Sequence, residues 1–265
     1  MRIDRTFTVL ACGGTDPTGG AGIEGDLATL SAHGVWGTAV VTAVTAQNAS
    51  GVTAVHAIPP DVVASQIEAV LGQVPPRAVK TGMLLSAATA RTVARSLARA
   101  QVACVVDPVL SATAGGAALA DPDLAAALAE HLAPIATLVT PNLDEAAALL
   151  GRAVEPGEEE AAADALRQRL GADVLLKGGH AGGEAAVDWL ATRLGVRAFS
   201  LPRIATPHGH GSGCALASSL AVRLGRGQDL DVAVTGAKAY LHRALAAAGP
   251  LGTGRGPVRH DVAAD

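Results

Sequence analysis

Residues 6–26 read TFTVLACGGTDPTGGAGIEGD, and this stretch decides the fold class. Its first third, residues 6–12, has the apolar and β-branched composition of a buried strand. A glycine-rich turn follows, and the helical pattern of residues 20–33 begins directly after that turn. A buried strand that runs through a glycine turn into a helix is typical of the opening of a βαβ unit.

The rest of the chain continues this alternation of short β-branched runs and longer Ala- and Leu-rich segments. The pattern predicts further strands at residues 38–45, 79–82, 103–107, 136–140 and 173–177, and a late hairpin from 185–192 and 196–201. It predicts helices at residues 61–72, 87–101, 122–132, 143–150, 158–170, 213–224 and 229–247. We therefore expect one α/β domain, residues 1–265, in which helices cover both faces of a mainly parallel central sheet.

The composition excludes several classes of protein. The 265 residues carry a formal net charge of −4, and only 2% of them are aromatic, so neither charge nor stacking rings indicate a nucleic-acid surface. The three cysteines, at positions 12, 104 and 214, suit neither a zinc knuckle nor a disulfide framework. A cytoplasmic location is expected, and no segment has the pattern of a signal peptide or a membrane span.

The first glycine-rich loop contains residues 20–25, GAGIEG, which match the dinucleotide fingerprint GxGxxG. The second predicted strand, however, ends in Ala46-Gln47-Asn48, without the acidic residue that would hold a ribose. A dinucleotide-dependent oxidoreductase therefore stays open only as an alternative. The glycines equally fit a tight packing turn, or a pocket in which a small ligand approaches the backbone.

A second glycine-rich loop, residues 208–214 (HGHGSGC), precedes a long Ala- and Leu-rich helix. Free N–H groups at a helix start, together with the helix dipole, favour phosphate oxygens. The chain has no GxxxxGK[ST] motif, so it is not a P-loop NTPase. Cys214 falls in the first helical turn, where the pKa of a thiol is expected to be lowered; a small core cysteine is the alternative.

Polar residues follow several predicted strands, at the edge where ligands bind in open α/β sheets. Lys177, one of only three lysines, precedes a Gly-Gly turn and suits phosphate charge, unless it is an ordinary surface lysine. Asn142 and Glu145 suit either the water shell of a magnesium ion or the cap of the following helix. Gln47 offers a donor and an acceptor to the edge of a heteroaromatic ring.

Taken together, these motifs resemble those of the hydroxymethylpyrimidine/phosphomethylpyrimidine kinases of the ribokinase-like superfamily, in order and over nearly the whole chain. The matching segments are residues 14–23 with Asp26, TAQN (45–48) with Gly51-Val52, KTGM (80–83), TPN (140–142) with Glu145, KGGH (177–180), DWL (188–190), HGSGC (210–214) and GRGPV (254–258). Ser212 and Ala215 depart from the family pattern, which commonly has threonine at both positions.

The resemblance implies a ribokinase-like fold and transfer of the γ-phosphoryl group of ATP, with Mg²⁺. The acceptor would be 4-amino-5-hydroxymethyl-2-methylpyrimidine, and then its monophosphate, in thiamine biosynthesis. Gln47 would hydrogen-bond the pyrimidine, and Asp26 would lie near the phosphate route. The residues that would shape the pyrimidine pocket are Gly14, Ala21, Met83 and Val109.

The resemblance also implies a phosphate side of the site. The residues it assigns to the anion hole and to catalysis are Lys177, Gly211, Ser212, Gly213 and Cys214. Cys214 would face the substrate hydroxymethyl group, as a base or as a hydrogen-bond partner. The residues it assigns to the nucleotide are Lys177, Asn142, Glu145 and Lys238, with Glu145 serving magnesium through water.

Two further alternatives stay open. A pyridoxal or pyridoxine kinase of the same cysteine-containing type would share the fold, ATP and the anion hole, although Gln47 and Met83 favour the pyrimidine. A non-catalytic ligand-binding module would require Lys177 or Cys214 to be dispensable. A homodimer is expected by family analogy alone.

Overall fold

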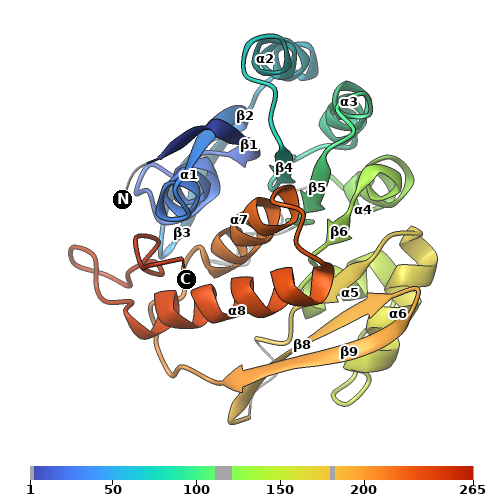
Figure 1. Ribbon diagram of the computed structural model, residues 1–265, viewed down its shortest axis with the longest axis vertical. Helices are drawn as coiled ribbons and strands as arrows, with labels where there is room; N and C mark the ends of the chain where they lie inside the picture. Colours follow the sequence, from blue (N-terminus) through green and yellow to red (C-terminus); the bar gives the residue numbers. More distant parts are fainter. Residues whose placement is uncertain (1–2, 111–120, 180–182, 265) are drawn as a thin grey trace.

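The computed structural model describes residues 3–110, 121–179 and 183–264. Within these residues nine strands form one sheet in the order β3-β2-β1-β4-β5-β6-β7-β8-β9 (Figure 1). The strands from β2 across to β7 pair in parallel, whereas β3, β8 and β9 are added by antiparallel pairing. The mainly parallel α/β sheet that the sequence predicts is therefore confirmed.

The strands differ in burial according to their place in the sheet. Every residue of β4 and β7 is buried. This explains the continuous apolar sequence of β7, whereas β4 buries the charged side chain of Lys80. The edge strand β3 is exposed or half-buried throughout, so it carries no apolar run and the sequence pattern does not predict it. The strands are β1 (Asp4–Gly14), β2 (Val35–Asn48), β3 (Gly51–Ala57), β4 (Ala78–Thr81), β5 (Ala103–Val106), β6 (Leu138–Val139), β7 (Val174–Leu176), β8 (Ala185–Thr192) and β9 (Gly195–Pro202).

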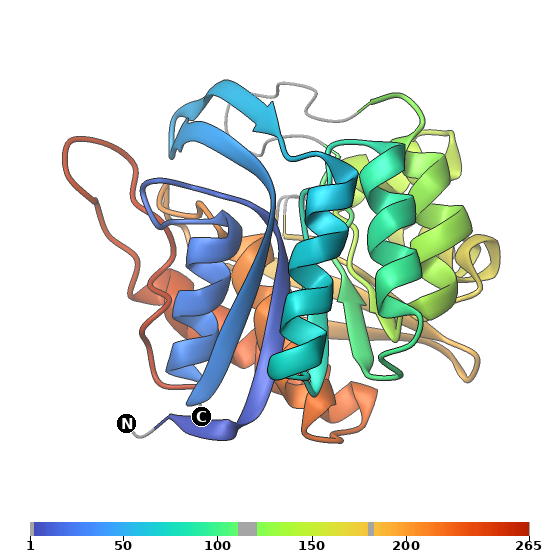
Figure 2. The same cartoon turned by 90° about the horizontal axis from the view of Figure 1, so that it is seen from above.

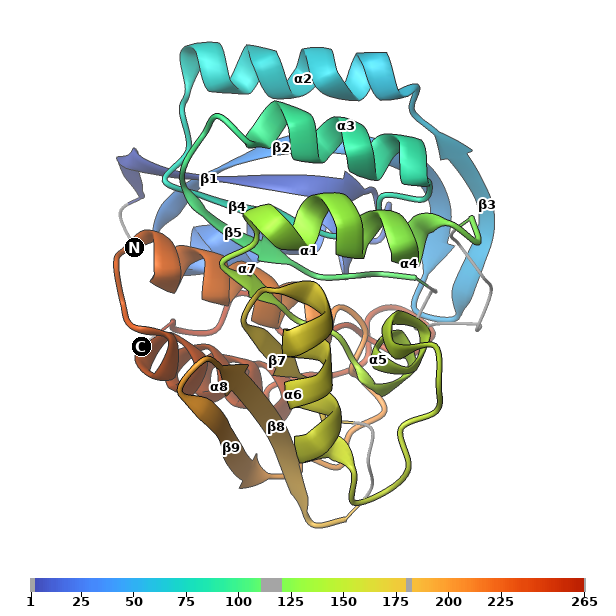
Figure 3. The same ribbon diagram turned by 90° about the vertical axis from the view of Figure 1, so that its right-hand side faces the viewer.

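Helices cover both faces of the sheet, as expected (Figure 3). Helices α2 to α6 pack into the apolar cluster on one face, and α1, α7 and α8 pack into the cluster on the other. None of the helices in the described residues is long and apolar enough to span a bilayer. The helices are α1 (Gly22–Ala32), α2 (Pro60–Gln73), α3 (Ala87–Leu97), α4 (Leu124–Ala127), α5 (Leu143–Leu150), α6 (Glu159–Leu170), α7 (Ser212–Gly225) and α8 (Leu230–Ala246).

Two predicted helices end differently from the expectation. The helix predicted at residues 122–132 is regular only in α4 and continues as a π-helical turn, Leu128–Leu132. Pro134, which lacks an N–H group, then lies in a short 3₁₀ turn, Ala133–Ile135. The helix predicted at residues 87–101 ends at Leu97, and Gln101 adopts a left-handed φ of 47°.

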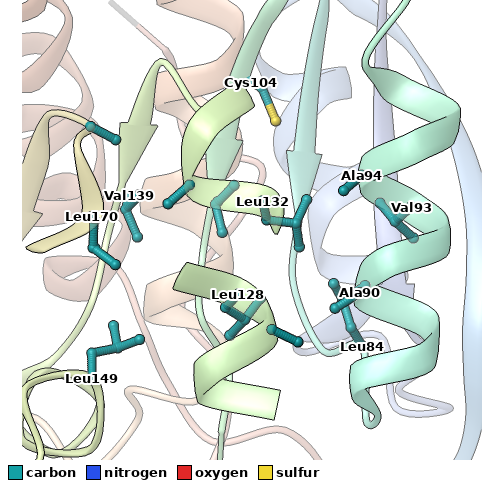
Figure 4. Packing of buried hydrophobic residues seen from close by; sticks show 14 of the residues in the cluster. Leu84, Ala90, Val93, Ala94, Cys104, Leu128, Leu132, Val139, Leu149 and Leu170 are labelled. Carbon is teal, nitrogen blue, oxygen red and sulfur yellow. The ribbon is translucent and has the colours of Figure 1, made fainter. Parts of the chain in front are cut away.

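The larger apolar cluster fixes the strands from which the site is built. Ala90 and Val93 of α3 lie near Leu128 and Leu132 across a shared core (Figure 4). This core is made of small and branched side chains, in keeping with the few aromatic residues of the chain. Close packing of this kind restricts movement of the strand ends.

The segment that follows α8 lies beside α1 (Figure 2). The hydroxyl of Tyr240 donates to the carbonyl of His260 at 2.7 Å. The His260 ring lies 2.9 Å from the Thr29 hydroxyl and 2.9 Å from the carbonyl of Gly20. The end of the chain is therefore packed against the first glycine-rich loop.

Candidate active site

The carboxyl ends of the parallel strands meet at one edge of the sheet, where a cavity of about 510 Å³ opens. The strand order arranges the residues that follow β2, β1, β4, β5, β6 and β7 in that sequence along the cavity. Every predicted site residue except Asp26 lines it: Gly14, Ala21, Gln47, Met83, Val109, Asn142, Glu145, Lys177, Gly211, Ser212, Gly213, Cys214 and Lys238.

Helix α7 presents its first turn to this cavity. Gly211 precedes the helix with a φ of 81°, a conformation that glycine adopts without strain. A Cβ atom on Gly211 would lie 1.9 Å from the carbonyl oxygen of Gly20, so a side chain does not fit here. The first turn includes Gly213 and Cys214, and amides in the first turn of a helix have no intrahelical acceptor. The turn is therefore suited to bind an anion.

Lys177 lies opposite this turn, directly after β7. Its Nζ atom lies 2.7 Å from Oδ1 of Asp107 and 3.8 Å from Oε2 of Glu145. A Cβ atom on Gly213 would lie 3.5 Å from the same Nζ. Burial lowers the pKa of Lys177, but Asp107 and Glu145 outweigh it, so the pKa is raised and the side chain is a cation. The alternative of an ordinary surface lysine is wrong, because the side chain is only 14% exposed.

Cys214 lines the cavity, but its thiol is not activated in the way the sequence indicates. Burial raises the pKa of Cys214 to about 11, an effect that Lys80 opposes and that Asp26 and Asp107 strengthen. The expected lowering of this pKa is therefore wrong. The effects of burial and of two carboxylates on the pKa outweigh the effect of the helix N-terminus. Near neutral pH the group is a thiol that can take part in hydrogen bonds but removes protons poorly.

Asp26 is the predicted site residue that does not line the cavity. It is fully buried, and its Oδ2 accepts a hydrogen bond from Lys80 at 2.8 Å while its Oδ1 accepts one from Ser218 at 2.8 Å. Burial raises the pKa of Asp26, although Lys80 and Ser218 oppose this. Because both oxygens are engaged inside the protein, Asp26 holds Lys80 and is not placed to contact a ligand directly.

Asn142 and Glu145 form a capping box at the start of α5. The Asn142 side chain accepts from the Glu145 amide at 2.8 Å, and the Glu145 carboxylate accepts from the Asn142 amide at 2.8 Å. The helix-capping interpretation is therefore confirmed. Burial raises the pKa of Glu145 to about 7, against the opposing charge of Lys177 and with a contribution from Asp107.

The described residues contain no group of three His, Cys, Asp or Glu side chains placed to hold a metal alone. Magnesium usually keeps several waters and binds through one or two carboxylates together with phosphate oxygens. Asp107 and Glu145, on either side of Lys177, are a donor set of that kind. The site therefore fits a magnesium ion that arrives with a nucleotide.

Lys238, predicted to face the nucleotide, is already paired within the protein. Its Nζ lies 2.5 Å from Oδ2 of Asp188, and Oδ1 of Asp188 accepts from the Gly178 amide at 2.9 Å. A Cβ atom on Gly178 would lie 1.9 Å from the carbonyl oxygen of Val187. The pair therefore fixes the turn that directly follows Lys177.

The opposite end of the cavity is shaped by small residues and Met83. A Cβ atom on Gly14 would lie 2.2 Å from Cε of Met83, so the glycine provides the space that the methionine fills. Gln47 faces this end, and its Oε1 lies 3.4 Å from the hydroxyl of Thr45. This end offers an apolar wall and one amide.

Sequence reasoning did not select four residues that belong to this site: Lys80, Asp107, Asp188 and His210. Asp107 directly follows β5 and Lys80 lies within β4, but their partners are 70 and 54 residues away in the chain. Because lysine is rare in this chain, the sequence did contain a signal that Lys80 could be a functional residue. His180, part of the KGGH motif, lies outside the described residues.

A family model described as phosphomethylpyrimidine kinase matches residues 16–259. The chain belongs to the phosphomethylpyrimidine kinase family. It is 45% identical, over 259 residues, to the hydroxymethylpyrimidine/phosphomethylpyrimidine kinase of Rhizobium meliloti (strain 1021), with 96% of this chain and 97% of the relative covered. Membership of a kinase family leaves the oxidoreductase and non-catalytic alternatives without support.

Solved structures give the same fold. The phosphomethylpyrimidine kinase of Clostridium difficile 630 is 35% identical, with a TM-score of 0.77 and coverage of 90% of this chain and 99% of that one. An ADP complex of Bacillus subtilis pyridoxal kinase is 30% identical, with a TM-score of 0.86 and coverage of 96% and 97%. The ribokinase-like fold predicted from the sequence is confirmed, and kinases of two substrate types share it with this member of the phosphomethylpyrimidine kinase family.

Proposed function

We propose that this protein is an ATP-dependent kinase that phosphorylates 4-amino-5-hydroxymethyl-2-methylpyrimidine and then its monophosphate. The observation that carries the proposal is the position of Gly213 in the first turn of α7. That turn faces Lys177 on one side, and the same cavity continues to Gly14 and Gln47 on the other. A phosphoryl group that binds between the two sides would contact both the amides of the first turn of α7 and the ammonium of Lys177.

Phosphoryl transfer depends mainly on positioning and on stabilisation of spreading negative charge. The amides of Gly213 and Cys214 and the ammonium of Lys177 supply that stabilisation from fixed positions, with little reorganisation. In this proposal the pyrimidine binds at the end of the cavity near β2, β1 and β4, and the nucleotide binds at the end near β6 and β7.

Cys214 acts in this proposal as a neutral partner of the substrate hydroxyl. Its pKa of about 11 disfavours a thiolate at neutral pH. The thiol orients the hydroxyl toward the phosphoryl group. The hydroxyl proton leaves late in the transfer, when the oxygen has become acidic, and passes to an oxygen of the transferred phosphoryl group.

Magnesium, when bound with ATP, would neutralise charge on the phosphates. Asp107 and Glu145 are the carboxylates that would hold it, Glu145 through water. The ammonium of Lys177 offsets part of the repulsion between these two carboxylates, because its Nζ lies 2.7 Å from Oδ1 of Asp107 and 3.8 Å from Oε2 of Glu145.

A pyridoxal kinase activity is the second candidate, because a pyridoxal kinase structure superposes with a TM-score of 0.86. Identity of 45% to a pyrimidine kinase, against 30% to that pyridoxal kinase, favours the pyrimidine. The amide of Gln47 also suits the nitrogen-rich edge of an aminopyrimidine. A cytoplasmic location and a homodimer remain predictions.

The test is ADP release from Mg·ATP with the pyrimidine, its monophosphate or pyridoxal as acceptor. We expect turnover of both pyrimidines, and two ADP for each hydroxymethylpyrimidine consumed. Gln47→Leu should raise the KM of the pyrimidine by about tenfold or more, because it leaves a ring polar group unpaired, and should leave the KM of ATP unchanged. Turnover of pyridoxal alone would overturn the substrate assignment.

A further inference from the structure

We infer that the buried pair of Asp16 and His210 is a positioning pair that keeps the two glycine-rich loops in register for phosphoryl transfer. Asp16 belongs to the first loop, on the pyrimidine side of the cavity, and His210 belongs to the second loop, beside the proposed anion hole. This inference rests on the proposed function, but its structural part can be tested without any substrate.

Asp16 is the organising side chain of the first loop. It is fully buried, and its Oδ1 accepts from the amide of Thr18 at 2.9 Å and from the hydroxyl of Thr18 at 2.8 Å. Its Oδ2 accepts from the amide of Ala21 at 2.9 Å. Burial raises the pKa of Asp16, but the bonds from His210 and Thr18 outweigh it and the pKa lies below its usual range.

His210 brings the second loop to this carboxylate. Its Nε2 lies 2.7 Å from Oδ2 of Asp16 across 194 residues of sequence, and its side chain is only 7% exposed. An ionised carboxylate can only accept, so Nε2 carries the proton and donates. The carbonyl of His210 accepts from the amide of Val258 at 2.9 Å, which fixes the backbone on the other side.

The two loops also touch directly beside this hydrogen bond. A Cβ atom on Gly20 would lie 2.7 Å from Cδ2 of His210, and one on Gly211 would lie 1.9 Å from the oxygen of Gly20. Two successive residues of the second loop, His210 and Gly211, therefore contact the first loop so closely that Gly20 and Gly211 leave no room for a side chain. The next residues, Ser212 and Gly213, begin the helix turn that faces Lys177.

This arrangement links the acceptor and the anion hole mechanically. Gly14 and Ala21 line the pyrimidine end, and Ala21 is held by Asp16. Gly213 lies where its Cβ would be 3.5 Å from Lys177. Loss of the His210 bond should let the anion hole shift relative to the acceptor, and a misplacement of about 1 Å can cost about 10²-fold in rate.

The experiment compares His210→Ala, His210→Gln and Asp16→Asn with a control, Thr29→Val. Gln can place an N–H donor near the position of Nε2, whereas Ala cannot. Asp16→Asn replaces one acceptor oxygen by a donor, so at least one of the bonds from Ala21, Thr18 and His210 is lost. Thr29→Val removes another buried hydrogen bond near the first loop, the one to His260, without touching the second loop.

We expect His210→Ala and Asp16→Asn to lower kcat by about 10²-fold while both KM values change by less than about threefold. His210→Gln should recover at least about tenfold of that loss, and Thr29→Val should keep the kcat of the wild type. Equal kcat for His210→Ala and wild type, equal damage from Gln and Ala, or an equal loss in Thr29→Val would each overturn the inference.

Hydrogen exchange of the amides at residues 211–214, measured on the protein without substrate, separates the two proposals. Faster exchange there in His210→Ala and Asp16→Asn, but not in Thr29→Val, supports the positioning pair even if no tested acceptor is turned over. Unchanged exchange in both pair variants would overturn it even if the kinase activity is established.

Discussion

The Nζ atom of Lys177 lies 2.7 Å from Oδ1 of Asp107, so the cation proposed to neutralise phosphate charge is fixed between the ends of β7 and β5. Thr140 also donates to that oxygen, at 3.1 Å. A buried cation held in this way stays near the first turn of α7 without a bound ligand to order it.

Lys177→Met should lower kcat by about 10²- to 10³-fold, because one fixed positive group is lost from the transition state. It should also destabilise the fold by about 3–5 kcal/mol, because Asp107 and Glu145 lose their buried partner. Steady-state kinetics and urea unfolding measure the two effects. The double variant Lys177→Met/Asp107→Asn should regain part of the stability but none of the activity.

The matched control for stability is Arg197→Met, which breaks an exposed ion pair to Asp231. Its free energy of unfolding should change by less than about 1 kcal/mol. Equal stability of Lys177→Met and Arg197→Met would show that the Lys177 pair is not a buried, desolvated one.

Cys214 should react slowly with iodoacetamide at neutral pH, because burial holds its pKa at about 11. The alkylation rate should rise about tenfold per pH unit and level off only near the pKa. The rate is measured by mass spectrometry, with Cys214→Ala to correct for Cys12 and Cys104. A rate that is already maximal near neutral pH would instead support the lowered thiol pKa that the sequence indicates for Cys214.

Cys214→Ser should keep more activity than Cys214→Ala, because a hydroxyl can replace a neutral thiol as a hydrogen-bond partner. The measurement is kcat with the pyrimidine at neutral pH. Equal loss in both variants would favour a role that only the sulfur can fill.

Lys238→Met and Asp188→Asn should raise the KM of ATP by similar factors, because Lys238 acts through Asp188 on the turn at Gly178. The double variant should be no worse than either single one, since residues that act as one unit are not additive. A rise in KM confined to Lys238→Met would instead indicate direct contact of that lysine with the nucleotide.

Glu145→Gln should change the pH dependence of stability in a defined direction. The pKa of Glu145 is raised from 4.5 to about 7 in the fold, so the folded wild type holds a proton that the unfolded chain has lost. The free energy of unfolding of the wild type should therefore fall as the pH rises between these values, by up to about 3 kcal/mol.

The glutamine of Glu145→Gln can still accept from the Asn142 amide, so the capping box is kept while the titration is removed. The difference between variant and wild type should be constant below and above this pH range. Urea unfolding at several pH values measures it, and a flat difference throughout would contradict the raised pKa.

Most of the elements could be predicted from the sequence, because their patterns are local. The buried strands show as apolar runs, and α5 has the predicted bounds because Asn142 and Glu145 form a local capping box. The edge strand β3 could not be predicted, because it buries no face and is defined by its pairing with β2. The irregular end of α4 likewise depends on how Leu128 and Leu132 pack in the core.

The candidate site likewise has one part that the sequence predicts and another that depends on the tertiary structure. The glycine loops, Lys177 and the residues at strand ends were determined by the sequence, since strand–loop–helix motifs set their own local geometry. Only the tertiary structure decided which groups meet: Lys177 with Asp107, Asp16 with His210, and Lys238 with Asp188. It also decided the protonation of Cys214, because a pKa depends on burial and on charges brought from distant segments, which no local pattern records.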